Sequence, residues 1–269
     1  MSVHFLLPMD ALGDGCVLAP ERFDPRSHVR STEHSAARLD ALVQICSDSV
    51  RPAGTGHATH ETHGASGAHA LVLDTTHAYE GFVIARHGPQ PLAELGSSKR
   101  VLQPGDVIVS RLRPYLRQVA LIDEGLFHLR AGGNHVVASS EFFVLRRCPA
   151  VDRADGARTM RPATPVEPAG LIPFLLSPSV QQALAAGQEG GHHPRFRRDL
   201  LASLRVPDGV LRQAAVVASR LRAHAQAVRA ALQDSQALAL AVDHGMADAV
   251  GSEPGTAHAD AAAAGTIGP

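Results

Sequence analysis

The chain has 269 residues, a net charge of −1 and 45% hydrophobic residues, enough to fill the core of one large or two small domains. Its apolar runs are far shorter than the roughly 18 to 20 residues that span a bilayer, and no basic segment precedes an apolar core at the N-terminus. We therefore expect a cytoplasmic protein without a membrane span. The cysteines Cys16, Cys46 and Cys148 lack the CxxC spacing of a zinc ribbon and are expected to be reduced.

The charge is distributed unevenly along the chain. Residues 1–83 contain 5 Lys and Arg against 10 Asp and Glu, residues 84–230 contain 20 against 11, and residues 231–269 contain 0 against 5. Among the 20 basic residues of the middle segment only Lys99 is a lysine, and the arginine fork matches phosphate groups and the edge of guanine. This pattern favours a nucleic-acid partner, although the arginine-rich composition of a high-GC genome would give the same count.

The first third of the chain predicts little regular structure. Residues 1–20 form an apolar, turn-rich N-terminal segment, after which Phe23-Asp24-Pro25 leads into a predicted entry helix that ends at Leu42. The helix prediction depends on Ala36, Leu39, Leu42 and Val43, which recur at helical spacing. Residues 51–69 are almost entirely Gly, Ala, Ser, Thr and His, which predicts a mobile loop.

Short β-branched and aromatic runs follow and predict a mixed or antiparallel β domain. The predicted strands are Ala70 to Leu73, Gly81 to Ala85, Asp106 to Ser110, Gln118 to Ile122, His135 to Ala138 and Glu141 to Leu145. A proline-rich connector leads to a predicted helix from Leu171 to Ala186 with a second start at Ser177-Pro178. A basic glycine loop, Gly187 to Phe196, comes next.

A seven-residue repeat then predicts a long helix over 208–245. Nine of ten positions on two adjoining seams are apolar: Leu211, Ala218, Ala225, Leu232 and Ala239 on one, and Ala214, Leu221, Val228, Ser235 and Val242 on the other. Such spacing is typical of a coiled coil covered by a partner helix, although an amphipathic helix lying along its own domain would show the same pattern. Residues 246–269 lack large apolar side chains and are expected to be a disordered tail.

Several stretches, in this order, resemble the specificity (S) subunit of type I restriction-modification systems. They are Phe23-Asp24-Pro25, GDVIVSRLRPYLRQVALI at 105–122, HVVASSEFFVLR at 135–146, LIPFLLSPSVQQALAAGQEGGHHPRFRRDLLASLRVPDG at 171–209, and the long helix behind them. S subunits usually contain two target recognition domains and two helices. This sequence has one of each, so it resembles a half subunit.

The resemblance implies an α+β fold: a mixed or antiparallel β target recognition domain with short helices over 21–207, followed by the coiled-coil-type helix. It implies that the domain docks on double-stranded DNA and that the helix packs against a second helix, in a homodimer or with a different half subunit. The implied partners are a DNA methyltransferase (modification) subunit and a restriction or translocase subunit. Whether the system is true type I restriction-modification or another defence or methylation system stays open.

Two basic clusters are the candidate DNA contacts. The first set is Ser98, Lys99 and Arg100, predicted to lie in a polar loop suited to phosphate contact, with Arg111, Arg113, Tyr115 and Arg117. The second set is His192, His193, Arg195, Arg197 and Arg198. The candidate partner contacts on the helix are Leu211, Ala214, Ala218, Leu221, Ala225, Val228 and Leu232. Phe142, Phe143 and Val144 are predicted core residues, and only ten aromatic residues occur in the chain, which disfavours single-strand binding by base stacking.

The sequence contains no recognised catalytic motif, so we predict a protein without enzymatic activity, cofactor or metal. The best rival is a metal site made of His57, His60, His63 and His69, but its glycine-rich surroundings offer no rigid support for ligands. The other alternative is an assembly protein that uses the same fold and helix without binding DNA.

Overall fold

The computed structural model describes residues 36–46, 48–50, 69–85, 87–128, 135–149, 165–191 and 193–251, with side chains up to Asp243. The start of the predicted entry helix, the predicted loop 51–68 with three of its histidines, His192, Cys16 and the tail beyond 251 lie outside these ranges. The chain divides into two units, Met1–Ala227 and Val228–Pro269. The fold is α+β, as predicted from the sequence.

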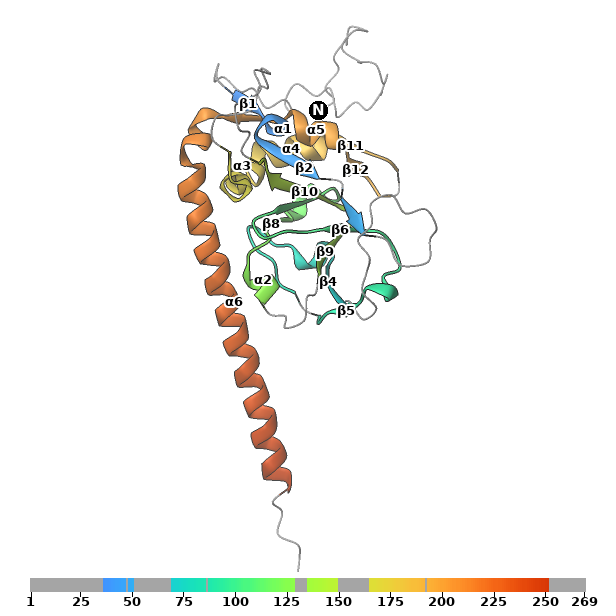
Figure 1. The fold of residues 1–269 in the computed structure, drawn as a ribbon, viewed down its shortest axis with the longest axis vertical. Helices are drawn as coiled ribbons and strands as arrows, with labels where there is room; N and C mark the ends of the chain where they lie inside the picture. The colour runs from blue at the N-terminus through green and yellow to red at the C-terminus, as the bar shows by residue number, and fades with distance from the viewer. Residues whose placement is uncertain are drawn as a thin grey trace, which may run out of the picture. The chain divides into compact units, whose positions relative to one another are not determined.

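The first sheet of the larger unit has four antiparallel strands in the order β2-β10-β7-β8, of which β2, β10 and β8 are labelled in Figure 1. These are β2 (Val43–Cys46), β10 (Phe142–Arg147), β7 (Val107–Ser110) and β8 (Val119–Leu121). Alternate residues enter two different cores: Val109 and Phe143 pack on one face, and Ile108 and Phe142 on the other. Because both faces are covered, these strands are continuous apolar runs, and the prediction that Phe142, Phe143 and Val144 are core residues is confirmed.

The second sheet has five strands in the order β3-β6-β9-β4-β5. These are β3 (Ser49–Val50), β6 (Lys99–Val101), β9 (His135–Ser139), β4 (His69–Leu73) and β5 (Gln90–Pro91). Strands β4 and β9 are parallel and the other neighbours antiparallel, so the sheet is mixed. Five of the six predicted strands are therefore present in the two sheets.

Three segments differ from the sequence-based prediction. The described end of the entry helix is β1 (Ala36–Arg38) and a single turn, α1 (Leu39–Leu42), because Val43 already pairs with β10. Gly81 to Ala85 forms only isolated bridges, Ala78 to Val83 and Gly81 to Ala120, because a tight turn at Gly81 (φ 98°) interrupts it. The glycine loop is a hairpin of β11 (Gln188–Glu189) and β12 (Arg195–Phe196).

The helices contact different parts of the two sheets: α3 (Ile172–Leu175) contacts β8 and α2 (Gly125–His128) contacts β9. Helix α3 is followed by α4 (Pro178–Ala186), which confirms the predicted break at Ser177-Pro178, where the Ser177 hydroxyl accepts a hydrogen bond from Val180 N. The others are α5 (Arg198–Ser203) and α6 (Asp208–Gly251), with β13 (Arg205–Pro207) pairing with β1 before α6. Short 3-10 helices are η3 (Thr75–His77), η4 (Leu92–Glu94), η5 (Pro114–Leu116) and η6 (Pro168–Leu171).

Within the described ranges, no single helix has both the length and the apolar composition of a membrane span. Only the segments Pro168–Leu175 and Pro178–Ala186 taken together pass such a test, and they are bent by 78°.

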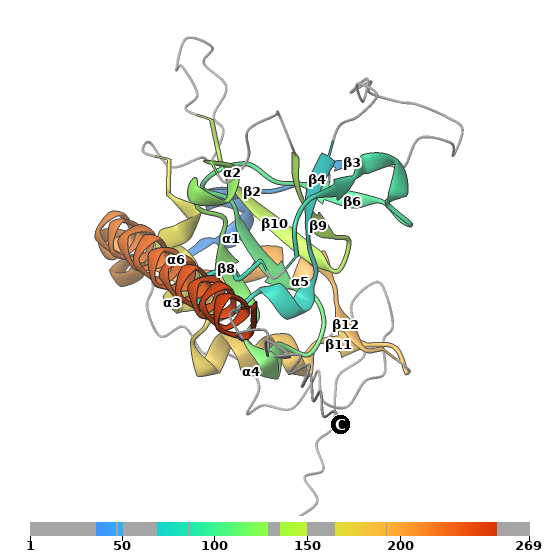
Figure 2. The ribbon, with the colours of Figure 1, turned by 90° about the horizontal axis from the view of Figure 1, so that it is seen from below.

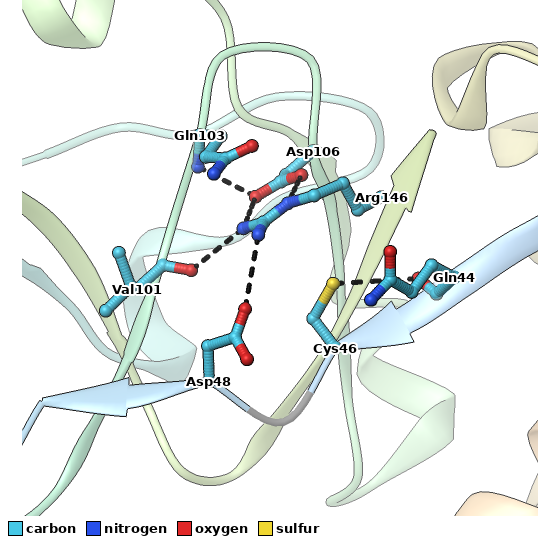
Figure 3. A network of polar contacts seen from close by, with 7 residues as sticks. All are labelled: Gln44, Cys46, Asp48, Val101, Gln103, Asp106 and Arg146. Atoms are coloured by element: carbon cyan, nitrogen blue, oxygen red, sulfur yellow. Dashed lines mark hydrogen bonds and ion pairs between the residues drawn. The ribbon is translucent and has the colours of Figure 1, made fainter. Parts of the chain in front are cut away.

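A buried ion pair connects the two sheets (Figure 3). Arg146 of β10 donates two hydrogen bonds to the Asp106 carboxylate, Nε to Oδ1 at 2.9 Å and Nη2 to Oδ2 at 2.8 Å, and a third to the Val101 carbonyl of β6 at 3.2 Å. Asp106 is 2% exposed and also accepts from Gln103 N at 2.7 Å. The hydrogen bond to Asp106 raises the pKa of Arg146, so the guanidinium stays charged in the folded protein.

We expect Asp106→Ala to destabilise the fold by about 3 to 5 kcal/mol, because it leaves the Arg146 guanidinium buried without its counter-charge. Chemical denaturation measures this loss. Asp48→Ala is the matched control: Asp48 lies 3.4 Å from the same guanidinium but its side chain is 65% exposed, so its loss should cost about 0.5 kcal/mol or less. Equal losses for the two variants would contradict the assignment.

Candidate nucleic-acid interface

The first predicted cluster forms a rigid loop after β7. Arg113 (φ 45°) and Arg117 (φ 52°) both adopt the left-handed conformation and enclose the one-turn helix η5. Leu116 N donates to Arg113 O at 2.8 Å and Arg117 N to Pro114 O at 2.7 Å, which closes the turn. Left-handed backbone is strained for residues with a Cβ, so it persists only where the surroundings fix it. Pro114 is buried beneath the turn, while Arg113 is exposed.

Arg117 anchors this loop to the body of the protein. Its guanidinium binds Glu80 in a bidentate pair, with Nε to Oε1 at 2.6 Å and Nη2 to Oε2 at 2.8 Å, and donates to the Leu176 carbonyl at 2.7 Å. The hydrogen bond from Arg117 lowers the pKa of Glu80. The sequence singled out Arg117 as a DNA contact, and the structure gives it a positioning role that the sequence did not predict.

The second predicted cluster lies directly beside the first. Phe196 N of β12 donates to Arg111 O at 3.3 Å, and Leu112 forms a bridge with Arg195. Figure 2 shows the β11–β12 hairpin at the periphery of the globule. Two arginine-rich segments about 80 residues apart in sequence are thereby joined into one surface, which we call the arginine surface: Arg111, Arg113, Arg117, His193, Arg195 and Arg197.

Glu141 connects the two segments of the arginine surface. Its carboxylate accepts two hydrogen bonds from Arg195, at 2.8 Å and 2.7 Å, and its carbonyl accepts from Arg111 N at 2.8 Å. The hydrogen bond from Arg195, with the positive charges of Arg195 and then Arg111, lowers the pKa of Glu141. The Arg111 guanidinium lies 5.2 Å from the centre of the Phe143 ring, a cation–π contact that restricts it further.

The remaining members of the second cluster differ in solvent exposure and in the contacts of their side chains. Arg197 is 63% exposed and makes only a loose pair with Asp199 at 3.6 Å. Arg198 donates to the Ile45 carbonyl at 2.9 Å, so it connects α5 to β2. His193 is exposed, and its carbonyl accepts from Arg195 at 3.0 Å. Arg197 is therefore the member best placed to reach an external ligand.

Ser98, Lys99 and Arg100 were predicted to lie in a polar loop, and for Lys99 and Arg100 this prediction is wrong. Both belong to β6, which is extended because Lys99 pairs with Ser139 on one side and with Val50 on the other. The Val101 carbonyl at the end of the same strand accepts a hydrogen bond from Arg146. Lys99 remains half-exposed, with its ammonium 2.6 Å from Ser97 Oγ, and Ser139 lies two residues before Glu141. The segment therefore adjoins the arginine surface through β9.

Carboxylates neutralise part of the arginine surface. Glu80, Glu141 and Asp199 pair with Arg117, Arg195 and Arg197. Within the described part of the chain, no side-chain hydrogen bond or ion pair engages Arg113. The arginine surface is thus less positive than the number of arginines in the sequence indicates. The same ion pairs hold Arg117, Arg195 and Arg197 in place.

The helix seam is covered differently from the sequence-based prediction. Ala214, Ala218 and Ala225 are at most 5% exposed, and Ala218 belongs to the main core of the larger unit. A Cβ on Gly170 would meet the Ala214 backbone at 2.2 Å, so only glycine permits this close approach.

The same correction extends to the other predicted partner contacts up to Ala225. Leu211 and Leu221 pack against the core, and Arg222 pairs with Glu167. Leu211, Ala214, Ala218, Leu221 and Ala225 therefore contact their own domain and are not available to a partner. Val228 and Leu232 are half-buried, and beyond them Leu238, Leu240 and Val242 are 59% to 69% exposed.

The described residues bear on the rival hypothesis of a metal site. They contain no group of three His, Cys, Asp or Glu side chains arranged to hold a metal ion. Of the four histidines in the rival metal hypothesis, only His69 is described, at the start of β4.

Comparison with known proteins gives a likeness to a solved structure. No family model and no curated protein matches the chain. One solved chain, from "Structural basis underlying complex assembly and conformational transition of the type I R-M system", is 20% identical, with a TM-score of 0.45 over 80% of this chain and 49% of its own length. This chain thus spans about half of that one, and the likeness does not by itself assign a function.

The Glu141–Arg195 pair predicts an acid-dependent contribution to stability. Because the pKa of Glu141 is lower in the folded protein than in the unfolded one, the ionised carboxylate stabilises the fold above its unfolded value of about 4.3. That contribution is lost as the pH falls through the lower, folded value. Urea denaturation should therefore show Glu141→Gln less stable than the wild type at pH 7, with the difference shrinking below about pH 4. A difference independent of pH would contradict this assignment.

Proposed function

We propose that this chain is a sequence-specific, double-stranded DNA-binding specificity subunit of a type I restriction-modification system or a related defence or methylation system. It acts in the cytoplasm, performs no catalysis, and guides a partner DNA methyltransferase, and an endonuclease where one is present, to its target. The observation that carries the proposal is the arginine surface, on which two arginine-rich segments distant in sequence meet on one rigid side of the domain.

The chemistry of this surface suits duplex DNA. Arg113 and Arg197 extend into solvent and can each neutralise a phosphate, while the paired arginines keep the loop and hairpin in a fixed register. Guanidinium groups held by carboxylates lose little conformational freedom when DNA binds. The scarcity of aromatic residues argues against single-stranded nucleic acid.

The second half of α6 supports a proposal about assembly. Its seam continues past Ala227 with Val228 and Leu232 and reaches exposed Val242. We infer that this part of the helix pairs with a second copy of the chain, or with another half subunit, and so restores a two-site reader. The alternative function is an assembly protein that keeps this pairing without binding DNA.

DNA binding is tested with the full chain on 30-base-pair duplexes of random sequence by fluorescence anisotropy across a salt series. The double variant Arg113→Ala with Arg197→Ala should bind more weakly and flatten the slope of log affinity against log salt by about 0.9 per lost phosphate contact. Arg220→Ala, an exposed arginine on α6, is the matched control and should leave the slope unchanged. Absence of binding by the wild type at low salt would favour the assembly-protein alternative.

Assembly is tested by sedimentation velocity. Val228→Asp with Leu232→Asp should convert a dimer into a monomer, because two charges would be buried in the helix pair. Gln233→Asp adds a charge beside the seam at an exposed position and should leave the dimer intact. Thermal unfolding of the larger unit should be unchanged in both variants. A wild-type chain that stays monomeric at high concentration would rule out the homodimer.

A further inference from the structure

Two large apolar side chains protrude from the loop between Arg113 and Arg117. Tyr115 is 69% exposed and Leu116 is 45% exposed, and we call them the η5 tip. Among the described residues, the other exposed large hydrophobic side chains all lie on α6: Val216, Leu238, Leu240 and Val242. The η5 tip is therefore the one place outside that helix where the described chain leaves large apolar groups in water.

The backbone holds the η5 tip in this position. Left-handed residues flank it on both sides, Pro114 is buried below it, and Arg117 fastens its end to Glu80 and to the Leu176 carbonyl. A mobile loop would fold its tyrosine onto the nearest apolar surface. In this loop the strained left-handed backbone of Arg113 and Arg117 holds the Tyr115 ring in solvent. The exposure of Tyr115 and Leu116 is therefore a consequence of the backbone conformation of this loop.

The surroundings of the η5 tip indicate its ligand. Arg113 lies two residues before Tyr115, Arg111 follows the end of β7, and paired Arg195 and exposed Arg197 lie in β12 and just after it. Two side chains are too few for a stable protein interface, which buries roughly 800 Å² on each partner. A flat apolar group between guanidinium groups instead matches a stacked base step between two phosphate backbones.

We propose that the η5 tip is a wedge that enters between two adjacent base pairs of the bound duplex, unstacks them and bends the DNA. Tyr115 stacks on one base of the opened step, Leu116 fills the other side, and Arg113 contacts a flanking phosphate. Because pyrimidine–purine steps unstack most easily, the wedge favours a TA or CA step at this point of the target, without hydrogen bonds to the bases. The inference rests on the proposed DNA-binding function.

The experiment uses 2-aminopurine, whose fluorescence rises when it unstacks. A target duplex is first selected by the wild-type chain from a randomised 40-base-pair pool, and 2-aminopurine then replaces each adenine in turn. Wild-type protein should raise the fluorescence at one step only. Tyr115→Ala should remove that rise and weaken target binding by roughly 5- to 150-fold, the range for losing one base–aromatic stack. Affinity for random duplexes at low salt should change less than about twofold, since the phosphate contacts remain.

Two further variants separate the wedge from general damage. Tyr115→Phe keeps the ring and should restore the fluorescence rise, whereas Val216→Ala, an equally simple truncation of an exposed side chain on α6, should behave as wild type. Melting temperatures should match the wild type because Tyr115 is largely in solvent. Target binding without any fluorescence rise would overturn the wedge and leave the proposed function standing. Failure of the wild type to bind any duplex would overturn both.

Discussion

The Arg146–Asp106 pair fixes the two sheets against each other, and the arginine surface depends on that register. Asp106 directly precedes β7, whose other end carries Arg111 and the η5 loop, while Arg146 is in β10, the strand that begins just after Glu141. The same guanidinium also binds Val101 of β6. One buried ion pair thus sets where the loop after β7, the turn before β10 and the strand carrying Lys99 lie. Breaking it leaves a largely buried charge without its counter-charge.

Much of the fold follows from local pattern. The runs at Val107 and Phe142 are continuous and apolar because both faces of their sheet are buried. Ser177-Pro178 marks a helix start because serine caps the first turn and proline suits its first position. Lys99 and Arg100 were misassigned because polar residues in a short central strand have no periodicity to distinguish them from a loop. The coiled-coil repeat was correctly placed on a helix, but a repeat carries no information about which surface covers it.

The sequence predicted which arginines belong to the candidate site, but not which of them are paired with carboxylates and which are exposed. Arginine clusters are visible in the sequence, whereas the carboxylates that hold Arg117 and Arg195 come from positions 37 and 54 residues away. Contacts between residues so far apart in sequence are formed only by the tertiary fold. The sequence alone therefore could not distinguish anchoring arginines from exposed ones. The surface accordingly combines fixed guanidinium groups, which position the loop and hairpin, with a smaller number that reach solvent.

The close packing of α6 on Gly170 has a practical consequence for protein engineering. Up to Ala225 the helix is an integral layer of its own domain, since Ala214 lies directly against Gly170 and Ala218 belongs to the main core. A modular exchange of the helix between related proteins, with the junction at Asp208, would therefore expose the core it was meant to leave intact. A junction near Val228 preserves the contacts of α6 with its own domain. It coincides with the division between the two units, beyond which the helix can be exchanged without disturbing that core.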